Sequence, residues 1–238
     1  MLHTSLSILL LWIAGLPIGA VPAVPADSSA EVMIEDFQEY QTGHWPTRWR
    51  FIYGKDNAAT LDELVADDRS FLVREERGRK FLRMETHGRS LRISLRAGID
   101  FDWDIEEHPR ISWEWRAHEL PVDAREDRLN DTGAALYVTF GADWLGRPRS
   151  IKYTYSTLLP KGTVVRFGSL RVLVVDTGLE GTGEWKTVDR DVMADYRQIF
   201  GGEPPRGPVS ITLWSDSDDT RSSAIADFDN IRLLPPRR

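Results

Sequence analysis

The residues of this chain that are best suited to chemistry are carboxylates in short clusters. The clusters are Glu35-Asp36, Asn130-Asp131-Thr132, Asp189-Arg190-Asp191 with Asp195, Asp216-Ser-Asp218-Asp219-Thr220 and Asp227-Phe-Asp229-Asn230. Carboxylate oxygens can ligate calcium or exchange protons with a substrate, so the clusters allow either kind of site. Asp216, Asp218 and Asp227 fit the spacing of an EF-hand loop, but Arg221 stands where that loop needs glycine for its sharp turn. We therefore interpret residues 216–220 by default as a solvated acidic turn.

The nine tryptophans are the second group of residues suited to chemistry. Trp113 and Trp115 alternate with polar residues in a strand-like segment, which favours burial in a core. Trp144 lies in the polar segment 141–150, where it either stacks on a ligand such as a sugar ring or folds back over the core. Trp214 faces away from the apolar positions of its own segment and is a second candidate platform, unless a further layer covers it.

Composition excludes several classes of protein. The chain carries 30 Lys and Arg against 37 Asp and Glu, a net charge of -7, which argues against nucleic acid as a partner. It contains no cysteine, so disulfides, a thiol nucleophile and cysteine-ligated metals are excluded. The sequence also lacks a G-x-S-x-G nucleophile elbow, an H-E-x-x-H zinc motif and a P-loop.

The first 26 residues are typical of a secretory signal peptide. They contain no Lys, Arg, Asp or Glu, and the apolar run 6–16 ends at Pro17 and is followed by small residues. The run is too short to span a bilayer, so we expect no stable membrane insertion after cleavage. We predict a signal peptide at 1–26, a linker at 27–31, one domain at 32–234 and a tail at 235–238, in a periplasmic or secreted protein.

The elements that must position these residues are mostly strands. Apolar and polar residues alternate with a period of two in 110–116, 136–140, 151–155 and 211–214, as expected of half-buried strands. One helix is predicted after Asp191, with apolar residues at helical spacing up to Phe200, and the segment 61–65 is a shorter helical candidate. Many strands with one late helix and no internal repeat predict an all-β fold, a two-sheet β-sandwich of the jelly-roll type.

The last predicted strand contains an irregularity. Phe228 and Ile231 are three residues apart, so they cannot share a face of a regular strand. We predict a β-bulge near Asp229.

Two short segments resemble jelly-roll carbohydrate-binding modules. Such modules often open with an acidic-Phe segment, as in Glu35-Asp36-Phe37, and close with a strand like Asp229-Asn230-Ile231-Arg232-Leu233. The first and last strands of those modules commonly share a structural calcium ion. The resemblance thus implies a possible calcium site with Asp36 and Asp229 as ligands.

A more specific resemblance covers most of the predicted domain. The chain resembles the bacterial domain of unknown function 3047 family in an ordered set of motifs. They are Trp113-Glu-Trp115-Arg116, Asp131 followed by Ala134-Ala135 and Tyr137-Val-Thr-Phe140, Tyr153-Thr-Tyr155, Trp185 to Asp191, Asp195-Tyr196-Arg197 and Asp216-Ser-Asp218-Asp219-Thr220. This resemblance implies an exported all-β protein and supplies no mechanism.

Three functions follow as hypotheses. The first is binding of a poly- or oligosaccharide of the cell envelope or of a secreted polysaccharide, because sugars need hydrogen-bonding side chains beside aromatic faces. The residues expected at the ligand are Glu114, Arg116, Asp131, Trp144, Tyr153, Tyr155, Trp214, Asp216 and Asp218.

The second hypothesis is an enzyme acting on glycans. A glycoside hydrolase would pair Glu114 with Asp131 or Asp216, whereas a polysaccharide lyase would use Tyr153 or Tyr155 as base beside Arg116. The third is a structural or protein-interaction module of the envelope, whose aromatic residues would all lie in the core.

Overall fold

The computed structural model describes residues 30–53, 57–59, 69–143 and 145–237. Its strands are β1 (Val32–Glu35), β2 (Arg50–Tyr53), β3 (Asn57–Ala59), β4 (Arg69–Glu76), β5 (Arg79–His87), β6 (Ser90–Arg96), β7 (Arg110–Glu119), β8 (Thr132–Ala142), β9 (Pro148–Ser156), β10 (Val164–Phe167), β11 (Leu170–Thr177), β12 (Lys186–Asp191), β13 (Ser210–Asp216) and β14 (Ser223–Leu234). The helices are the short 3-10 turn η2 (Gly178–Glu180) and α1 (Val192–Phe200). The segment 61–65 and Trp144 lie outside the described residues.

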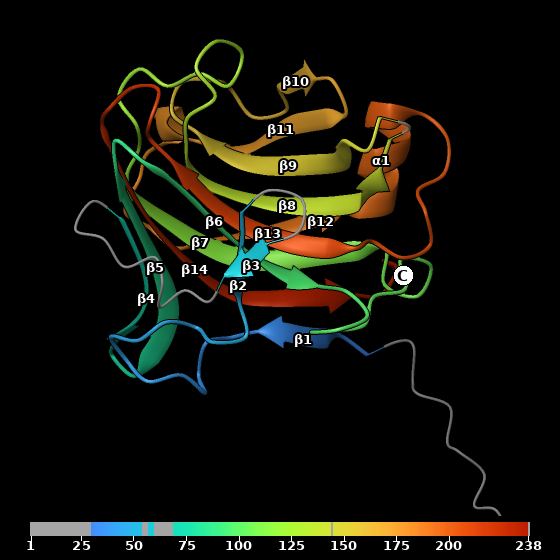
Figure 1. Cartoon of the computed structure of the whole chain (residues 1–238), viewed down its shortest axis with the longest axis horizontal. Coiled ribbons are helices and arrows are strands. Elements are labelled where there is room, and N and C mark those ends of the chain that lie inside the picture. The colour runs from blue at the N-terminus through green and yellow to red at the C-terminus, as the bar shows by residue number, and fades with distance from the viewer. Residues whose placement is uncertain (1–29, 54–56, 60–68, 144, 238) are drawn as a thin grey trace, which may run out of the picture.

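The strands form two sheets, which confirms the predicted β-sandwich (Figure 1). Sheet A has the order β12-β7-β14-β5-β4, with β1 added against β14, and sheet B has the order β10-β11-β9-β8-β13-β6-β2-β3. Neighbouring strands are antiparallel except β9 and β11, which run parallel. Segments distant in sequence, such as β6 and β13, therefore lie side by side in one sheet.

Aromatic residues of both sheets fill the space between them. Trp113 and Trp115 of β7 are fully buried, as their alternation predicts. Their rings lie 5.5 Å from those of Tyr153 and Tyr155 of β9, respectively, measured between ring centroids. Because residues alternate along a strand, the neighbours of these core residues point away from the core, and the outer faces of the two sheets look in opposite directions.

The predicted bulge in β14 is confirmed. Asp229 pairs with Glu114 and Arg232 with Ser112, so three steps along β14 oppose two along β7. Asn230 has a φ of 51°, in the left-handed region. The bulge lets Phe228 and Ile231 both point into the core, where each is fully buried.

The predicted late helix is also confirmed. Asp191 caps α1, its side chain accepting the backbone N–H of Ala194 at 2.8 Å, and the helix ends at Gly201. The helix lies at one end of the sandwich, between β12 and β13 in sequence (Figure 1). Within the described ranges, the structure holds no helix long and apolar enough to cross a membrane.

Candidate functional site

A groove of about 420 Å³ crosses the outer face of sheet B. Strand pairing builds it, because Arg92 of β6 lies opposite Trp214 of β13, and Thr212 lies opposite Tyr137 of β8. Hydroxyl side chains supply much of the rest of its wall, namely Ser94, Thr139, Ser150, Ser169, Ser210 and Thr212. Of the described residues that line the groove, Arg92 alone is charged.

Trp214 and Tyr137 form an aromatic pair in this groove. Their ring centroids are 5.4 Å apart and the ring planes are inclined by 43°. The indole Nε1–H of Trp214 donates to Ser90 Oγ at 2.6 Å, which fixes the orientation of the ring. The hydroxyl of Tyr137 is shielded from solvent and has no hydrogen-bond partner among the described residues. The groove therefore offers a fixed aromatic surface beside polar groups.

Lys152 lies behind this aromatic pair and is completely buried. Its Nζ is 4.4 Å from the centroid of the Trp214 ring and donates to the backbone and side-chain oxygens of Asn130, each at 3.4 Å. Burial lowers the pKa of Lys152 to about 8, although nearby carboxylates, first Glu126 and then Asp216, act against the shift.

Three carboxylates meet beside Lys152. One oxygen from each of Asp131, Asp216 and Asp218 lies within 4.8 Å of the other two. Asp216 is only 5% exposed, so the interpretation of 216–220 as a solvated turn fails for this residue. Burial, and after it the negative charge of Asp218, raises the pKa of Asp216 to about 7. Asp218 itself is exposed.

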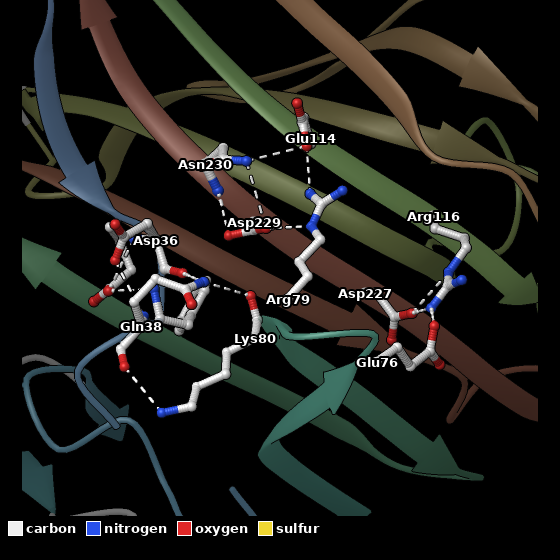
Figure 2. Close-up of polar contacts among 12 residues, drawn as sticks. Asp36, Gln38, Glu76, Arg79, Lys80, Glu114, Arg116, Asp227, Asp229 and Asn230 are labelled. Carbon is white, nitrogen blue, oxygen red and sulfur yellow. Dashed lines mark hydrogen bonds and ion pairs between the residues drawn. The ribbon is translucent and has the colours of Figure 1, made fainter. Parts of the chain in front are cut away.

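Glu114 and Arg116 lie on the opposite side of the molecule, on the outer face of sheet A. Figure 2 shows Arg79 between Glu114 and Asp229. The Nε of Arg79 is 2.6 Å from Asp229 Oδ2. Arg116 is paired with Asp227 at 2.6 Å and with Glu76 at 2.8 Å. Both predicted ligand residues are thus held in ion pairs on the face of the sandwich opposite Trp214.

The placement of these residues on opposite faces of the sandwich corrects the predicted catalytic pairing. Glu114 points outward from sheet A, whereas Asp216 shares the outer face of sheet B with Trp214, and Asp131 lies beside Asp216. The aromatic core separates the two faces, so Glu114 cannot flank one glycosidic bond together with Asp131 or Asp216.

A second hollow, of about 630 Å³, lies on the outer face of sheet A and includes Trp185. The guanidinium of Arg79 is 3.8 Å from the centroid of this ring, and that of Arg116 is 4.9 Å from it. Phe81 makes an edge contact with the same ring at 5.4 Å. Two guanidinium groups contact the ring of Trp185, whereas a single ammonium group contacts the ring of Trp214, so we favour the groove on sheet B as the ligand site.

The two tyrosines predicted at the ligand belong to the core instead. Tyr153 and Tyr155 are fully buried, and their hydroxyls donate to Asp195 Oδ2 at 3.0 Å and to the carbonyl of Gly181 at 2.6 Å. Large rings between the sheets bury apolar area, and internal acceptors satisfy their polar ends. Neither can contact a ligand on an outer face or serve as a lyase base there. The predicted ligand residue Trp144 is outside the described residues.

The two residues implied as calcium ligands are engaged separately. Asp36 accepts the backbone N–H of Gln38 at 3.1 Å, and Figure 2 places it apart from Asp229. Asp229 accepts from Arg79, so a cation at Asp229 would have to displace this guanidinium. The calcium site at Asp36 and Asp229 stays a prediction.

The chain matches the family described as protein of unknown function DUF3047 over residues 60–232. It belongs to this family. The match includes every strand from β4 to β13 and most of β14, so the resemblance seen in the sequence motifs is confirmed. No curated protein sequence matches the chain.

Solved structures similar to this DUF3047 protein include several carbohydrate-binding modules. The family 11 module of a cellulosomal cellulase of Clostridium thermocellum has 13% identity and a TM-score of 0.44, covering 87% of this chain and 95% of the module. A family 30 module of the same organism has 12% identity and a TM-score of 0.44, with 88% and 99% covered. A module of Caldicellulosiruptor saccharolyticus in complex with mannohexaose has 11% identity and a TM-score of 0.40, with 88% and 99% covered. At these scores the neighbours do not identify a ligand for the DUF3047 chain.

Sequence reasoning did not assign four residues at the groove of this DUF3047 protein to the ligand site. Arg92, Asn130 and Tyr137 line the groove, Lys152 lies behind it, and the four come from three strands and one loop. Alternation does place Tyr137 and Lys152 on the outer face, opposite apolar neighbours. Their meeting with Trp214 depends on the strand order β9-β8-β13, which a local pattern does not contain.

Proposed function

We propose that this protein is exported and binds carbohydrate in the groove on the outer face of sheet B. Export rests on the signal-like residues 1–26, with 27–31 as linker, 32–234 as the single binding domain and 235–238 as tail. The periplasm and the exterior of the cell are the compartments in which such a chain would meet envelope or secreted polysaccharides.

The aromatic pair of Trp214 and Tyr137 is the observation that carries this proposal. Sugar rings present C–H faces, which stack on aromatic rings, and a rim of hydroxyls, which needs donors and acceptors in fixed positions. The pair supplies the aromatic surface, and the surrounding hydroxyl side chains and Asn130 supply the polar partners. A volume of about 420 Å³ is within the range of small-ligand sites.

Arg92 adds a permanent positive charge to the groove. Its side chain is exposed, and no ion pair or hydrogen bond to it is found within the described part of the chain. Such a guanidinium can donate two parallel hydrogen bonds, either to neighbouring hydroxyls or to the carboxylate of a uronic acid. A binding screen should therefore contain neutral and acidic polysaccharides.

The test is a polysaccharide array followed by calorimetry on the best ligand, with Trp214→Ala and Arg92→Ala as variants. We expect Trp214→Ala to lose about tenfold or more in affinity, the equivalent of about 1.4 kcal/mol, because the stacking surface is removed. Trp185→Ala is the matched control, since it removes a partly buried tryptophan from the hollow on the opposite face of the sandwich and should bind like the wild type.

Two outcomes would count against the proposal. A folded Trp214→Ala variant that binds with wild-type affinity would remove the groove from the binding site. Silence of the wild-type protein across the array would favour the structural or protein-interaction module. Reducing ends are followed in the same assay, because their release would indicate an enzyme rather than a binding module.

A further inference from the structure

Three carboxylates from two parts of the chain converge near Lys152. Asp131 directly precedes β8, Asp216 ends β13, and Asp218 lies in the turn after β13. One oxygen from each lies within 4.8 Å of the other two. Like charges at this separation repel, and the repulsion is strongest where solvent is excluded. The arrangement therefore needs a counter-charge or a shared proton.

Asp216 supplies an observation that does not depend on this convergence. Its side chain is only 5% exposed, and its Oδ1 has neither contact with solvent nor a hydrogen-bond partner among the described residues. A buried carboxylate oxygen without a partner has lost its hydration without compensation, which is rare in native proteins. A cation placed among the three carboxylates would supply the missing partner.

Asp131 holds the cluster in a fixed geometry. It is fully buried, and its carboxylate accepts the backbone N–H groups of Asp219 at 3.1 Å and Thr220 at 2.8 Å. The hydroxyl of Thr220 adds a third bond at 2.6 Å. These bonds fix the turn that carries Asp218. A carboxylate has about four acceptor positions, so one position on Asp131 remains for a metal ion.

Lys152 is the buried cation beside this cluster, but it does not fill it. Within the described residues, no ion pair of 4.0 Å or less joins Lys152 to any of the three carboxylates. Its ammonium group instead lies against the Trp214 ring and donates to Asn130. Lys152 therefore acts on Asp131 and Asp216 at longer range, without a direct ion pair to the cluster.

We infer that Asp131, Asp216 and Asp218 form a binding site for a divalent cation, and that Ca²⁺ is the ion that suits it. The ligands are all oxygen atoms, which favours a hard cation over zinc or copper. Ca²⁺ accepts six to eight oxygen ligands in irregular geometry, and the exposed side of Asp218 leaves room for water to complete the shell. Mg²⁺ demands a near-ideal octahedron and is the poorer fit. The site is distinct from Asp36 and Asp229 and does not depend on carbohydrate binding.

The test measures cation binding to the purified protein after chelation and dialysis. Calorimetry with Ca²⁺ and with Mg²⁺ gives affinity and stoichiometry. Tb³⁺ luminescence excited through tryptophan reports the place of binding, because Trp214 lies two residues from Asp216 on the same strand face. We expect one Ca²⁺ per chain, with weaker binding of Mg²⁺, and a Tb³⁺ signal that Ca²⁺ displaces.

Matched variants locate the ion. Asp218→Asn changes an exposed residue, so the variant should fold, and we expect it to lose about tenfold or more in Ca²⁺ affinity. Asp219→Asn removes the same charge one residue later, outside the cluster, and should bind Ca²⁺ like the wild type. Asp36→Asn should also bind normally.

Three results would overturn the inference. The first is absence of Ca²⁺ binding to the chelated wild-type protein. The second is equal loss in Asp218→Asn and Asp219→Asn, which would mean attraction by the general negative field rather than ligation. The third is loss in Asp36→Asn with binding retained in Asp218→Asn, which would place the ion at the first strand. None of these measurements involves a carbohydrate. Failure of the cation site can therefore be distinguished from failure of the proposed carbohydrate binding.

Discussion

The ammonium group of Lys152 lies 4.4 Å from the centroid of the Trp214 ring, on the outer face of sheet B. Lys152 is fully buried, whereas Trp214 lines the groove, so a buried cation packs against the ring that we assign as the sugar platform. A cation over an aromatic face is stabilising, most of all where water is excluded. The contact thus holds the platform in place and partly offsets the cost of burying the lysine.

Replacing Lys152 with methionine should change how stability depends on pH. The folded pKa of about 8 is below the unfolded value of about 10.4, so the unfolded chain binds more protons between these values. Stability from this group is therefore gained as pH rises from about 8 toward 10.4 and is lost as pH falls. As pH rises over this range, the free energy of unfolding of the wild type should increase by on the order of 3 kcal/mol more than that of Lys152→Met. Urea unfolding at pH 7 and pH 10 measures the difference, and parallel changes in the two proteins would contradict it.

Asp227 should dominate the acid sensitivity of sheet A. Its buried carboxylate accepts from Arg83 at 2.7 Å, Arg116 at 2.6 Å and His118 at 2.7 Å. Burial alone would raise the pKa of Asp227, but the hydrogen bonds from these three residues outweigh it and hold the pKa below its usual value. Its contribution to stability is therefore present above pH 4 and lost as pH falls below it.

The variant Asp227→Asn tests this assignment. We expect a loss of about 3 kcal/mol at pH 7, because two guanidinium groups lose their charged partner, and a smaller loss at pH 3. Urea unfolding at both pH values gives the two differences. Asp219→Asn, an exposed carboxylate without these partners, should differ little from the wild type at either pH. An Asp227→Asn penalty that is equal at both pH values would contradict the assignment.

The sequence contains enough to predict the sandwich and its local details. Alternation identifies the core residues Trp113 and Trp115, the odd spacing of Phe228 and Ile231 reveals the bulge, and Asp191 marks the start of the helix. Each of these features is settled within a few residues of chain, by side-chain periodicity or by a single cap.

The site could be predicted only in part, because it depends on the order of strands within each sheet. Glu114 and Trp214 both look outward from their strands, yet β7 and β13 belong to different sheets and the two side chains point in opposite directions. Asp131 and Asp216 meet because β8 pairs with β13, far along the chain. The burial of Lys152 was missed for the same reason, since an outward lysine is normally solvated unless neighbouring strands cover it.

The cap at Asp191 can be tested with a conservative pair of substitutions. Asp191→Ala removes the acceptor for the backbone N–H of Ala194, and we expect a loss of about 1 kcal/mol in the free energy of unfolding. Asp191→Asn keeps a capping oxygen and should lie close to the wild type. Thermal or urea unfolding of the three proteins is sufficient, and equal loss in both variants would assign the effect to the charge instead.

The two core tryptophans of β7 should respond differently to the same substitution. The indole Nε1–H of Trp115 donates to the buried Asp176 Oδ2 at 2.9 Å, whereas that of Trp113 has no partner among the described residues. Trp115→Phe therefore leaves a carboxylate oxygen without its donor, while Trp113→Phe removes an unpaired polar group together with the lost ring volume. The rings are in contact, with centroids 5.3 Å apart, so the two cavities form in the same part of the core. We expect Trp115→Phe to cost about 1–3 kcal/mol more than Trp113→Phe in urea unfolding at pH 7. Equal losses would mean that ring volume alone determines the contribution of both residues.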